Sequence, residues 1–129
     1  MTLPACPCGS GLALSRCCGP RIDDTAPAPT AEALMRSRYT AYTQGDAAYL
    51  LATWHPATRP ETLQLDEEPQ PQWIGLTVKR HEIQDAEHAT VEFVARYKIN
   101  GRAFKLHESS RFVRENGRWY YVDGDVQTA

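Results

Sequence analysis

Four cysteines within residues 6–18 constrain the N-terminal part of this chain more than any other feature of its sequence. They stand as Cys6-x-Cys8, then eight residues, then the adjacent pair Cys17-Cys18, and the chain contains no others. Neighbouring cysteines cannot easily pair with each other, because a disulfide needs two Cβ atoms that face each other at a set separation. In a reducing compartment, four closely spaced thiols favour one tetrahedral Zn²⁺. The alternatives are a strained disulfide pair and free thiols without a role.

The residues between the two cysteine pairs fit a metal-binding loop. Gly9, Ser10 and Gly11 permit positive φ angles and a close approach of the backbone to a metal. Backbone N–H groups there could also donate to the thiolates. Four thiolates close the coordination sphere, so we expect one structural Zn²⁺ rather than a catalytic one. The segment has almost no hydrophobic core beyond Leu12 and Leu14, and zinc binding would therefore drive its folding.

Composition and charge limit the classes of protein to which this chain can belong. The chain has 129 residues, of which 42% are hydrophobic and 23% charged, enough for one domain with a small appendage. The N-terminus lacks the pattern of a signal peptide, and no apolar run approaches the length of a membrane helix. We therefore expect a cytoplasmic protein without a membrane partner. The net charge of −2 has well-mixed signs, so no nucleic-acid partner is expected either.

Two helices should follow a linker at residues 23–30, which is extended and contains two prolines. The first helix is predicted from Ala31 to about Gln44, with Thr30 as its N-cap and a stop at Gly45. Asp46 should cap a second, very apolar helix with the sequence AAYLLATW, which Pro56 helps to end.

Four strands are predicted after a proline-rich loop at residues 56–71. In the first, Ile74, Leu76 and Val78 alternate with polar residues. Asn100-Gly101 and Asn116-Gly117 are two-residue hairpin signals. The fold class is therefore α+β, a curved antiparallel sheet with helices packed on one face. The predicted strands cover residues 73–83, 90–99, 102–113 and 118–125.

Two stretches resemble known families. "CPCGSG" followed by "CCG" is similar to the SEC-C motif, whose ligands map onto Cys6, Cys8, Cys17 and Cys18. "LMRSRYTAYTQGDAAYLLATWHP" and "VEFVARYKINGRAFKLHESSRFVRENGRWYYVDGD" resemble the YchJ-like proteins. That resemblance implies an NTF2-like (cystatin-like) cone, no established activity, and a sheet of the kind that often forms a homodimer. The implied parts are a SEC-C-type zinc knuckle at 1–22, the linker at 23–30 and an NTF2-like domain at 31–129.

The two hairpin turns also predict which residues share the covered face of the sheet. A two-residue loop at Asn100-Gly101 pairs Phe93 with Glu108, on a face that is otherwise apolar. The same calculation around Asn116-Gly117 pairs Phe112 with Tyr121, Ser110 with Asp123 and Glu108 with Asp125. Carboxylates on a covered face need partners. Arg38, on the apolar face of the first helix, is the predicted partner of Glu108, Asp123 or Asp125.

These residues could also line a ligand pocket inside the cone. The pocket candidates are Arg38, Tyr42, Trp54, His55, Glu108, Ser110 and Asp123. The competing interpretation is a structural ion pair between Arg38 and an acid, with His55 as a residue that packs or caps the helix end. His81, His88 and His107 have no motif around them.

Three functions are compatible with this pattern, and no motif identifies catalytic residues. The preferred hypothesis is an adaptor whose zinc knuckle docks on a protein partner while the linker tethers it to the cone. The second is a small ligand or substrate in the cone, with chemistry of the proton-transfer or hydration type. In the third, the knuckle only caps the domain. We expect a binding protein rather than an enzyme.

Overall fold

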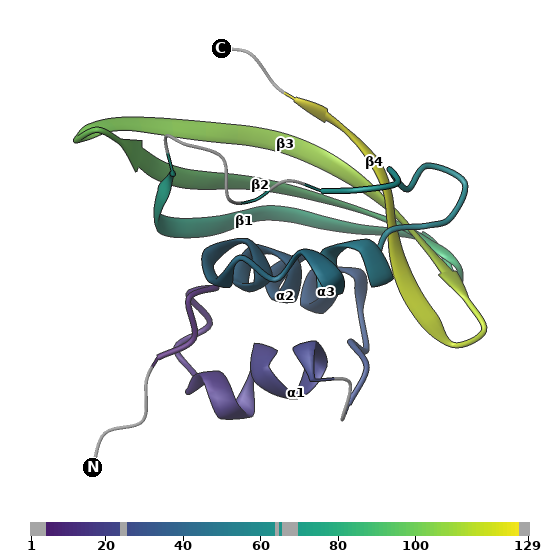
Figure 1. Ribbon diagram of the computed structural model, residues 1–129. Helices are drawn as coiled ribbons and strands as arrows, with labels where there is room; N and C mark the ends of the chain where they lie inside the picture. The colour runs from purple at the N-terminus through teal and green to yellow at the C-terminus, as the bar shows by residue number, and fades with distance from the viewer. Residues whose placement is uncertain (1–4, 24–25, 64, 66–69, 127–129) are drawn as a thin grey trace.

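The computed structural model describes residues 5–23, 26–63, 65 and 70–126. The predicted α+β architecture is confirmed, with four consecutive antiparallel strands in the order β1-β2-β3-β4. Figure 1 shows the curved sheet on one side of the helices. The elements are η1 (Leu14–Arg16), α1 (Cys18–Ile22), α2 (Ala31–Gln44), α3 (Ala47–Ala52), β1 (Gln72–Asp85), β2 (His88–Ile99), β3 (Arg102–Glu115) and β4 (Arg118–Val126).

Local signals set the ends of α2 where the sequence predicted them. The Thr30 hydroxyl accepts a hydrogen bond from the Ala33 amide at 3.0 Å, and Gly45 ends the helix in the left-handed region at φ 68°. Asp46 then caps α3 by accepting from the Tyr49 amide at 3.0 Å. Helix α3 ends at Ala52, two residues before the predicted end.

The hairpin turns confirm the predicted pairing of β2 with β3. Asn100 and Gly101 both have positive φ, 53° and 79°, as a turn that matches the twist of the strands requires. Phe93 therefore faces Glu108, as the register calculation predicted. The turn at Asn116-Gly117 has the same conformation, with φ of 54° and 77°.

A bulge corrects the predicted pairing of β3 with β4. Phe112 faces Tyr121 as predicted, but the register shifts between Arg111 and Phe112. Beyond the shift, Ser110 faces Gly124 instead of Asp123, and Glu108 faces Val126 instead of Asp125. Because side chains alternate between the faces of a strand, one extra residue moves both aspartates off the covered face.

A second bulge, in β1, overturns the predicted alternation at Ile74. The register of β1 with β2 shifts between Trp73 and Gly75, so Trp73 faces Tyr97 and Leu76 faces Ala95. Ile74 is left 47% exposed, whereas Trp73 packs against the core. Bulges of this kind increase the local twist of a strand and help to curve the sheet around the helices.

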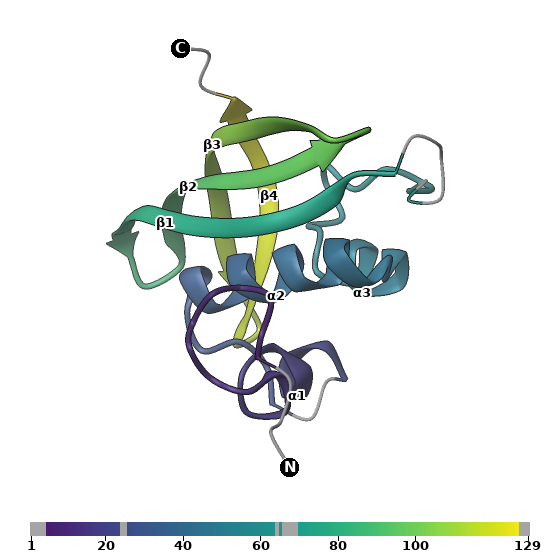
Figure 2. The same ribbon diagram turned by 90° about the vertical axis from the view of Figure 1, so that its left-hand side faces the viewer.

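The N-terminal knuckle forms a third layer, on the side of α2 that faces away from the sheet (Figures 1 and 2). All four cysteines belong to the same buried cluster as residues of α2 and of the sheet. Gly9 also lies against β1, where an added Cβ would stand 3.5 Å from the Leu76 carbonyl oxygen. The knuckle and the cone therefore share a buried core around α2, which is not the arrangement expected of a knuckle held to the cone only by a linker.

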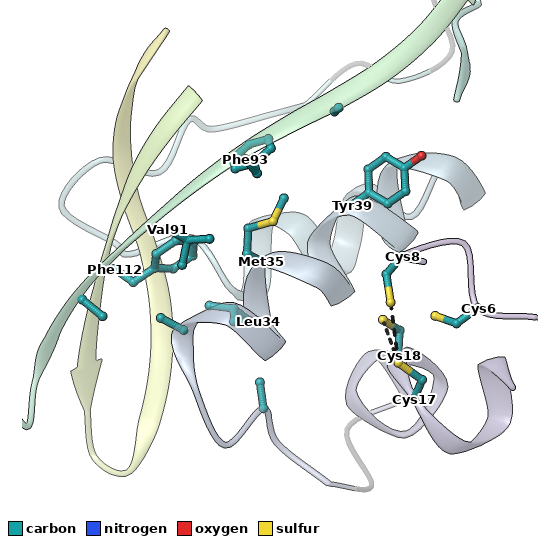
Figure 3. Packing of buried hydrophobic residues seen from close by; sticks show 14 residues of the cluster. Cys6, Cys8, Cys17, Cys18, Leu34, Met35, Tyr39, Val91, Phe93 and Phe112 are labelled. Carbon is teal, nitrogen blue, oxygen red and sulfur yellow. Dashed lines mark hydrogen bonds between the residues drawn. The ribbon is translucent and has the colours of Figure 1, made fainter. Parts of the chain in front are cut away.

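Burial along α2 reflects this double covering. Met35 points toward the sheet near Phe93 (Figure 3), whereas Thr40 is fully buried beside the cysteines. No helix within the described ranges is long and apolar enough to cross a membrane.

Candidate metal centre and candidate cavity

The structure brings the four cysteine sulfurs together in one buried cluster. Cys6 and Cys8 come from the N-terminal loop, while Cys17 and Cys18 stand where η1 passes into α1 (Figure 3). The four Sγ atoms lie within 4.8 Å of one another. None of the four is in a disulfide. This arrangement could hold a metal ion.

The distances between the sulfur atoms fit a shared metal ion better than a disulfide bond. The Sγ atoms of Cys8 and Cys17 are 3.6 Å apart, and those of Cys17 and Cys18 are 3.9 Å apart. A disulfide would need about 2.05 Å. Four sulfurs at the corners of a tetrahedron around one ion, each about 2.3 Å from it, would stand about 3.8 Å from one another.

Glycines shape the loop that carries the first pair of cysteines. Gly9 and Gly11 have φ of 79° and 85°, the left-handed region that the sequence predicted for them. The Cys6 amide donates to the Leu12 carbonyl at 2.9 Å, which closes the loop on itself. The Ser10 hydroxyl lies 3.1 Å from the Cys17 sulfur and thus links the two cysteine pairs.

Contacts and burial within the cluster shift the pKa values of three of its thiols. A hydrogen bond from Cys18 is the main cause that lowers the pKa of Cys8 to about 4. The same contact raises the pKa of Cys18, and burial raises the pKa of Cys17. A buried thiolate needs compensating charge, and a bound cation would supply it to all four sulfurs.

Side chains of α2 fasten the knuckle to the rest of the fold. Arg36 donates from Nη1 to the Cys8 carbonyl at 2.9 Å and from Nε to Glu32 at 3.1 Å. The Thr40 hydroxyl lies 3.7 Å from the Cys6 sulfur. Neither Arg36 nor Thr40 was predicted to take part in the site, and their only signal in the sequence is their position on the predicted first helix.

A cavity of about 290 Å³ lies between α2 and the inner face of the sheet. Five predicted pocket residues line it: Arg38, Tyr42, Trp54, Glu108 and Ser110. The other lining residues are Met35, Tyr39, Trp73, Phe93, Ala95, Leu106, Phe112 and Tyr121. The wall is therefore mostly aromatic and apolar, with one buried cation, Arg38, and one half-buried acid, Glu108.

Arg38 is buried as predicted, but its partners are not carboxylates. Its side chain is only 5% exposed, and Nη1 donates to the Leu50 carbonyl at 2.8 Å and to the Thr53 hydroxyl at 2.6 Å. Its guanidinium carbon lies 4.6 Å from the ring centre of Tyr121 and 5.3 Å from that of Trp54. None of the ion pairs between described residues includes Arg38. The predicted contact with an acid is wrong. The guanidinium instead contacts a carbonyl and a hydroxyl at the end of α3 and the faces of two aromatic rings.

Glu108 occupies the covered face of the sheet, as its pairing with Phe93 predicted. Burial raises the pKa of Glu108, while Ser110 and the charge of Arg38 act in the opposite direction. The carboxyl group lies directly over Gly124, where an added Cβ would stand 2.5 Å from Oε1. Only a glycine at position 124 leaves room for this orientation.

Asp123 and His55 do not line the cavity. Asp123 accepts a hydrogen bond from Nε of Arg111 at 2.6 Å and is half exposed, because the bulge moves it to the outer face. His55 lies 3.0 Å from Glu115 through Nε2, and its Nδ1 accepts from the Ala57 amide at 3.1 Å. His55 therefore packs after the end of α3, with its ring against Tyr120, and it accepts a hydrogen bond from the loop that follows.

Asp125 also lies outside the cavity. Its carboxylate accepts from Nη1 of Arg111 at 2.8 Å, beside the contact that Arg111 makes with Asp123. The predicted cluster of three acids on the covered face is therefore reduced to Glu108 with the hydroxyl of Ser110.

Comparisons with known proteins agree with this division of the chain. Residues 30–124 match the family described as "YchJ, middle NTF2-like domain", and residues 5–20 match the SEC-C motif. A UPF0225 protein from Ralstonia nicotianae is 59% identical, with 95% of this chain and 91% of the relative covered. One from Chromobacterium violaceum is 61% identical, with 95% and 93% covered.

Two solved structures are similar over nearly the whole chain. One is the solution structure of a SEC-C motif-containing protein from Rhodopseudomonas palustris, at a TM-score of 0.85 and 35% identity, with 95% of this chain and 98% of that one covered. The other is the crystal structure of a SEC-C motif-containing protein from Psychrobacter arcticus, at a TM-score of 0.78 and 30% identity, with 96% and 83% covered. The NTF2-like fold is thereby confirmed.

Proposed function

The chain belongs to the YchJ (UPF0225) family, in which a SEC-C motif and an NTF2-like domain occur together, and we propose that it is a zinc-stabilised binding protein of the cytoplasm. The observation that carries the zinc proposal is the spacing of the four sulfurs, at 3.6 Å and 3.9 Å for the two closest pairs. Zinc favours four thiolates in this arrangement. Cytoplasmic conditions would keep the thiols reduced.

The proposed zinc has a structural role. Cys6, Cys8, Cys17 and Cys18 would fill all four positions of a tetrahedral site, so the ion would neutralise buried thiolates and crosslink the loop to α1. The site itself offers no position for a substrate. Function would then depend on the surfaces and the cavity that the knuckle and α2 support.

Native mass spectrometry with elemental analysis tests the metal. We expect about one zinc per chain, as a single four-ligand site requires. Cys17→Ser should lose the zinc, whereas Ser15→Ala, an exposed position on η1, should keep it. Folded protein without metal, or with the cysteines in disulfides, would contradict the assignment.

The binding function that the geometry supports best is a small-ligand site in the cone. Its evidence is the cavity of about 290 Å³ with Arg38 and Glu108 in an otherwise aromatic wall, a combination typical of ligand pockets. Trp54, whose indole Nε1 is a buried donor without a partner among the described residues, is one of the aromatic side chains of this wall.

Mass spectrometry of protein purified from its own host, under native conditions, tests this site. We expect a bound small molecule that Ala95→Phe removes, because Ala95 lines the cavity and a phenyl ring would fill it. Ala103→Phe, at an exposed position on β3, should retain it. A wild-type protein that carries no small molecule, and whose cavity residues show no NMR shift with a fragment mixture, would refute the ligand site.

A protein partner on the knuckle is the second candidate. Leu12, in the loop between the cysteine pairs, is 53% exposed although it is a large apolar residue. Since the knuckle packs on α2, the partner would bind a surface that is fixed relative to the cone. Leu12→Asp should abolish capture of that partner, and Ser15→Asp should not; equal capture by both variants would argue against docking here. Dimerisation of the sheet stays a prediction.

A further inference from the structure

One edge of the Arg38 guanidinium has no hydrogen-bond partner among the described residues. Nη1 donates to Leu50 and Thr53, and the planar group lies near the rings of Tyr121 and Trp54. Nε and Nη2 make no hydrogen bond to any described residue. These two nitrogens form the edge of arginine that binds a carboxylate through two parallel hydrogen bonds.

The other contacts of Arg38 hold this edge in place. A guanidinium fixed by two hydrogen bonds and two rings loses little further freedom when it binds an anion. Arg38 is 95% buried, since its relative exposure is 5%, so an anion would meet it away from bulk water. A buried charge–charge hydrogen bond is stronger than one in water.

Glu108 is the second polar group of the cavity, and no ion pair joins it to Arg38 within the described part of the chain. The groups that act on Glu108 are Arg38 and Tyr42 from α2, Ser110 from β3, and Tyr121 and Asp125 from β4. Burial is the largest of these effects and raises the pKa of its carboxyl group. Glu108 therefore takes up a proton more readily than an exposed glutamate, and it can then donate a hydrogen bond.

The remaining wall favours a flat ligand. Among the lining residues, Trp73 packs with its ring centre 5.7 Å from that of Tyr39 and 6.0 Å from that of Tyr42. Aromatic faces and edges bind planar rings by stacking. At about 30 Å³ for each water, the 290 Å³ cavity corresponds to roughly ten waters, which is room for one or two fused rings.

We infer that the ligand of this cavity is a planar aromatic monocarboxylate, bound through its carboxylate to the Nε–Nη2 edge of Arg38. The inference rests on the proposed small-ligand site. The ring would lie among the aromatic side chains, and Glu108 would be protonated and donate a hydrogen bond to the ligand. A second anion beside an ionised Glu108 would be repelled, so binding takes up one proton from solvent when Glu108 starts ionised.

Isothermal titration calorimetry of the zinc-containing protein with two probes tests this class of ligand. Naphthoate and naphthamide have nearly the same shape, but only naphthoate carries a charge. We expect naphthoate to bind about tenfold more tightly, as expected for a charge-assisted pair of hydrogen bonds. In buffers of different ionisation enthalpy, naphthoate binding should show proton uptake, and Glu108→Gln should bind naphthoate without it.

A substitution of Arg38 distinguishes a bidentate hydrogen-bonded contact from simple charge attraction. Arg38→Lys keeps the charge but not the paired N–H groups, so naphthoate should lose about tenfold in affinity while naphthamide is unchanged. Arg111→Met, on the outer face, is the matched control and should change neither. An equal loss in Arg111→Met would overturn the inference by showing non-specific attraction.

The possible results distinguish a failure of this inference from a failure of the proposed ligand site on which it rests. If naphthoate and naphthamide bind equally tightly at the cavity, the carboxylate class is overturned and the ligand site stands. If neither probe binds and neither shifts the indole N–H signal of Trp54 in NMR spectra, the inference and the ligand site fail together.

Discussion

Replacement of Arg38 by methionine should destabilise the whole fold, because the charge has a structural role besides any ligand. The substitution keeps an apolar stem of similar length and deletes the guanidinium. Two hydrogen bonds disappear, to the Leu50 carbonyl at 2.8 Å and to the Thr53 hydroxyl at 2.6 Å. The contacts with the rings of Tyr121 and Trp54 are lost as well.

The magnitude follows from opposing contributions. Each hydrogen bond from a charged donor contributes about 1.5–3 kcal/mol, and each ring contact about 0.5–2 kcal/mol. The substitution also removes the cost of burying the cation, and this offsets several kcal/mol of the lost contacts. The expected net loss in the free energy of unfolding is about 3 kcal/mol. For a chain of 129 residues this corresponds to a fall of about 10 °C in Tm.

Urea unfolding and calorimetry of the zinc-containing protein measure this change. Arg111→Met is the control, because it removes an arginine whose partners Asp123 and Asp125 are exposed, and it should have a much smaller effect. A Tm for Arg38→Met within the error of the wild-type value would refute the structural role. It would mean that Arg38 only anchors a ligand in an open, hydrated cavity.

Three further predictions concern other parts of the fold. Cys17→Ser should lower the Tm of the entire chain in a single calorimetric transition, since the cysteines share a cluster with α2 and the sheet; separate transitions for knuckle and cone would contradict this. Burial raises the pKa of Glu108 above its ordinary value of 4.5. The free energy of unfolding should therefore fall as pH rises from that value through the raised pKa. Glu108→Gln should flatten this slope in urea titrations between pH 4 and 7. Gly124→Ala should displace the Glu108 carboxyl, whose Oε1 would stand 2.5 Å from the new Cβ; an unchanged Glu108 in a crystal structure of that variant would contradict the packing.

Features determined by local contacts were predictable from the sequence. Thr30 and Gly45 mark the ends of α2 because each satisfies backbone groups within a few residues. The turn at Asn100-Gly101 sets the register of β2 with β3, and the position of Glu108 opposite Phe93 follows from it. The four cysteines also come together as their spacing predicted.

Features that depend on distant contacts were not predictable in the same way. The bulge between Arg111 and Phe112 has no turn residue to signal it, and it moves Asp123 to the outer face. The partners of Arg38 are a backbone carbonyl and a hydroxyl at the end of α3, and a carbonyl is present at every position of every sequence. The packing of the knuckle on α2 depends on Thr40, a residue equally compatible with a solvent-exposed face.

Hydrogen exchange before and after zinc removal tests most directly the claim that the knuckle and the cone form one fold around α2. Because Arg36 and Thr40 join α2 to the cysteine loop, removal of zinc by a chelator should reduce protection of amides at residues 31–44 as well as at 6–20. Loss of protection at 6–20 alone, with 31–44 unchanged, would contradict the account and show that the knuckle is an independent unit.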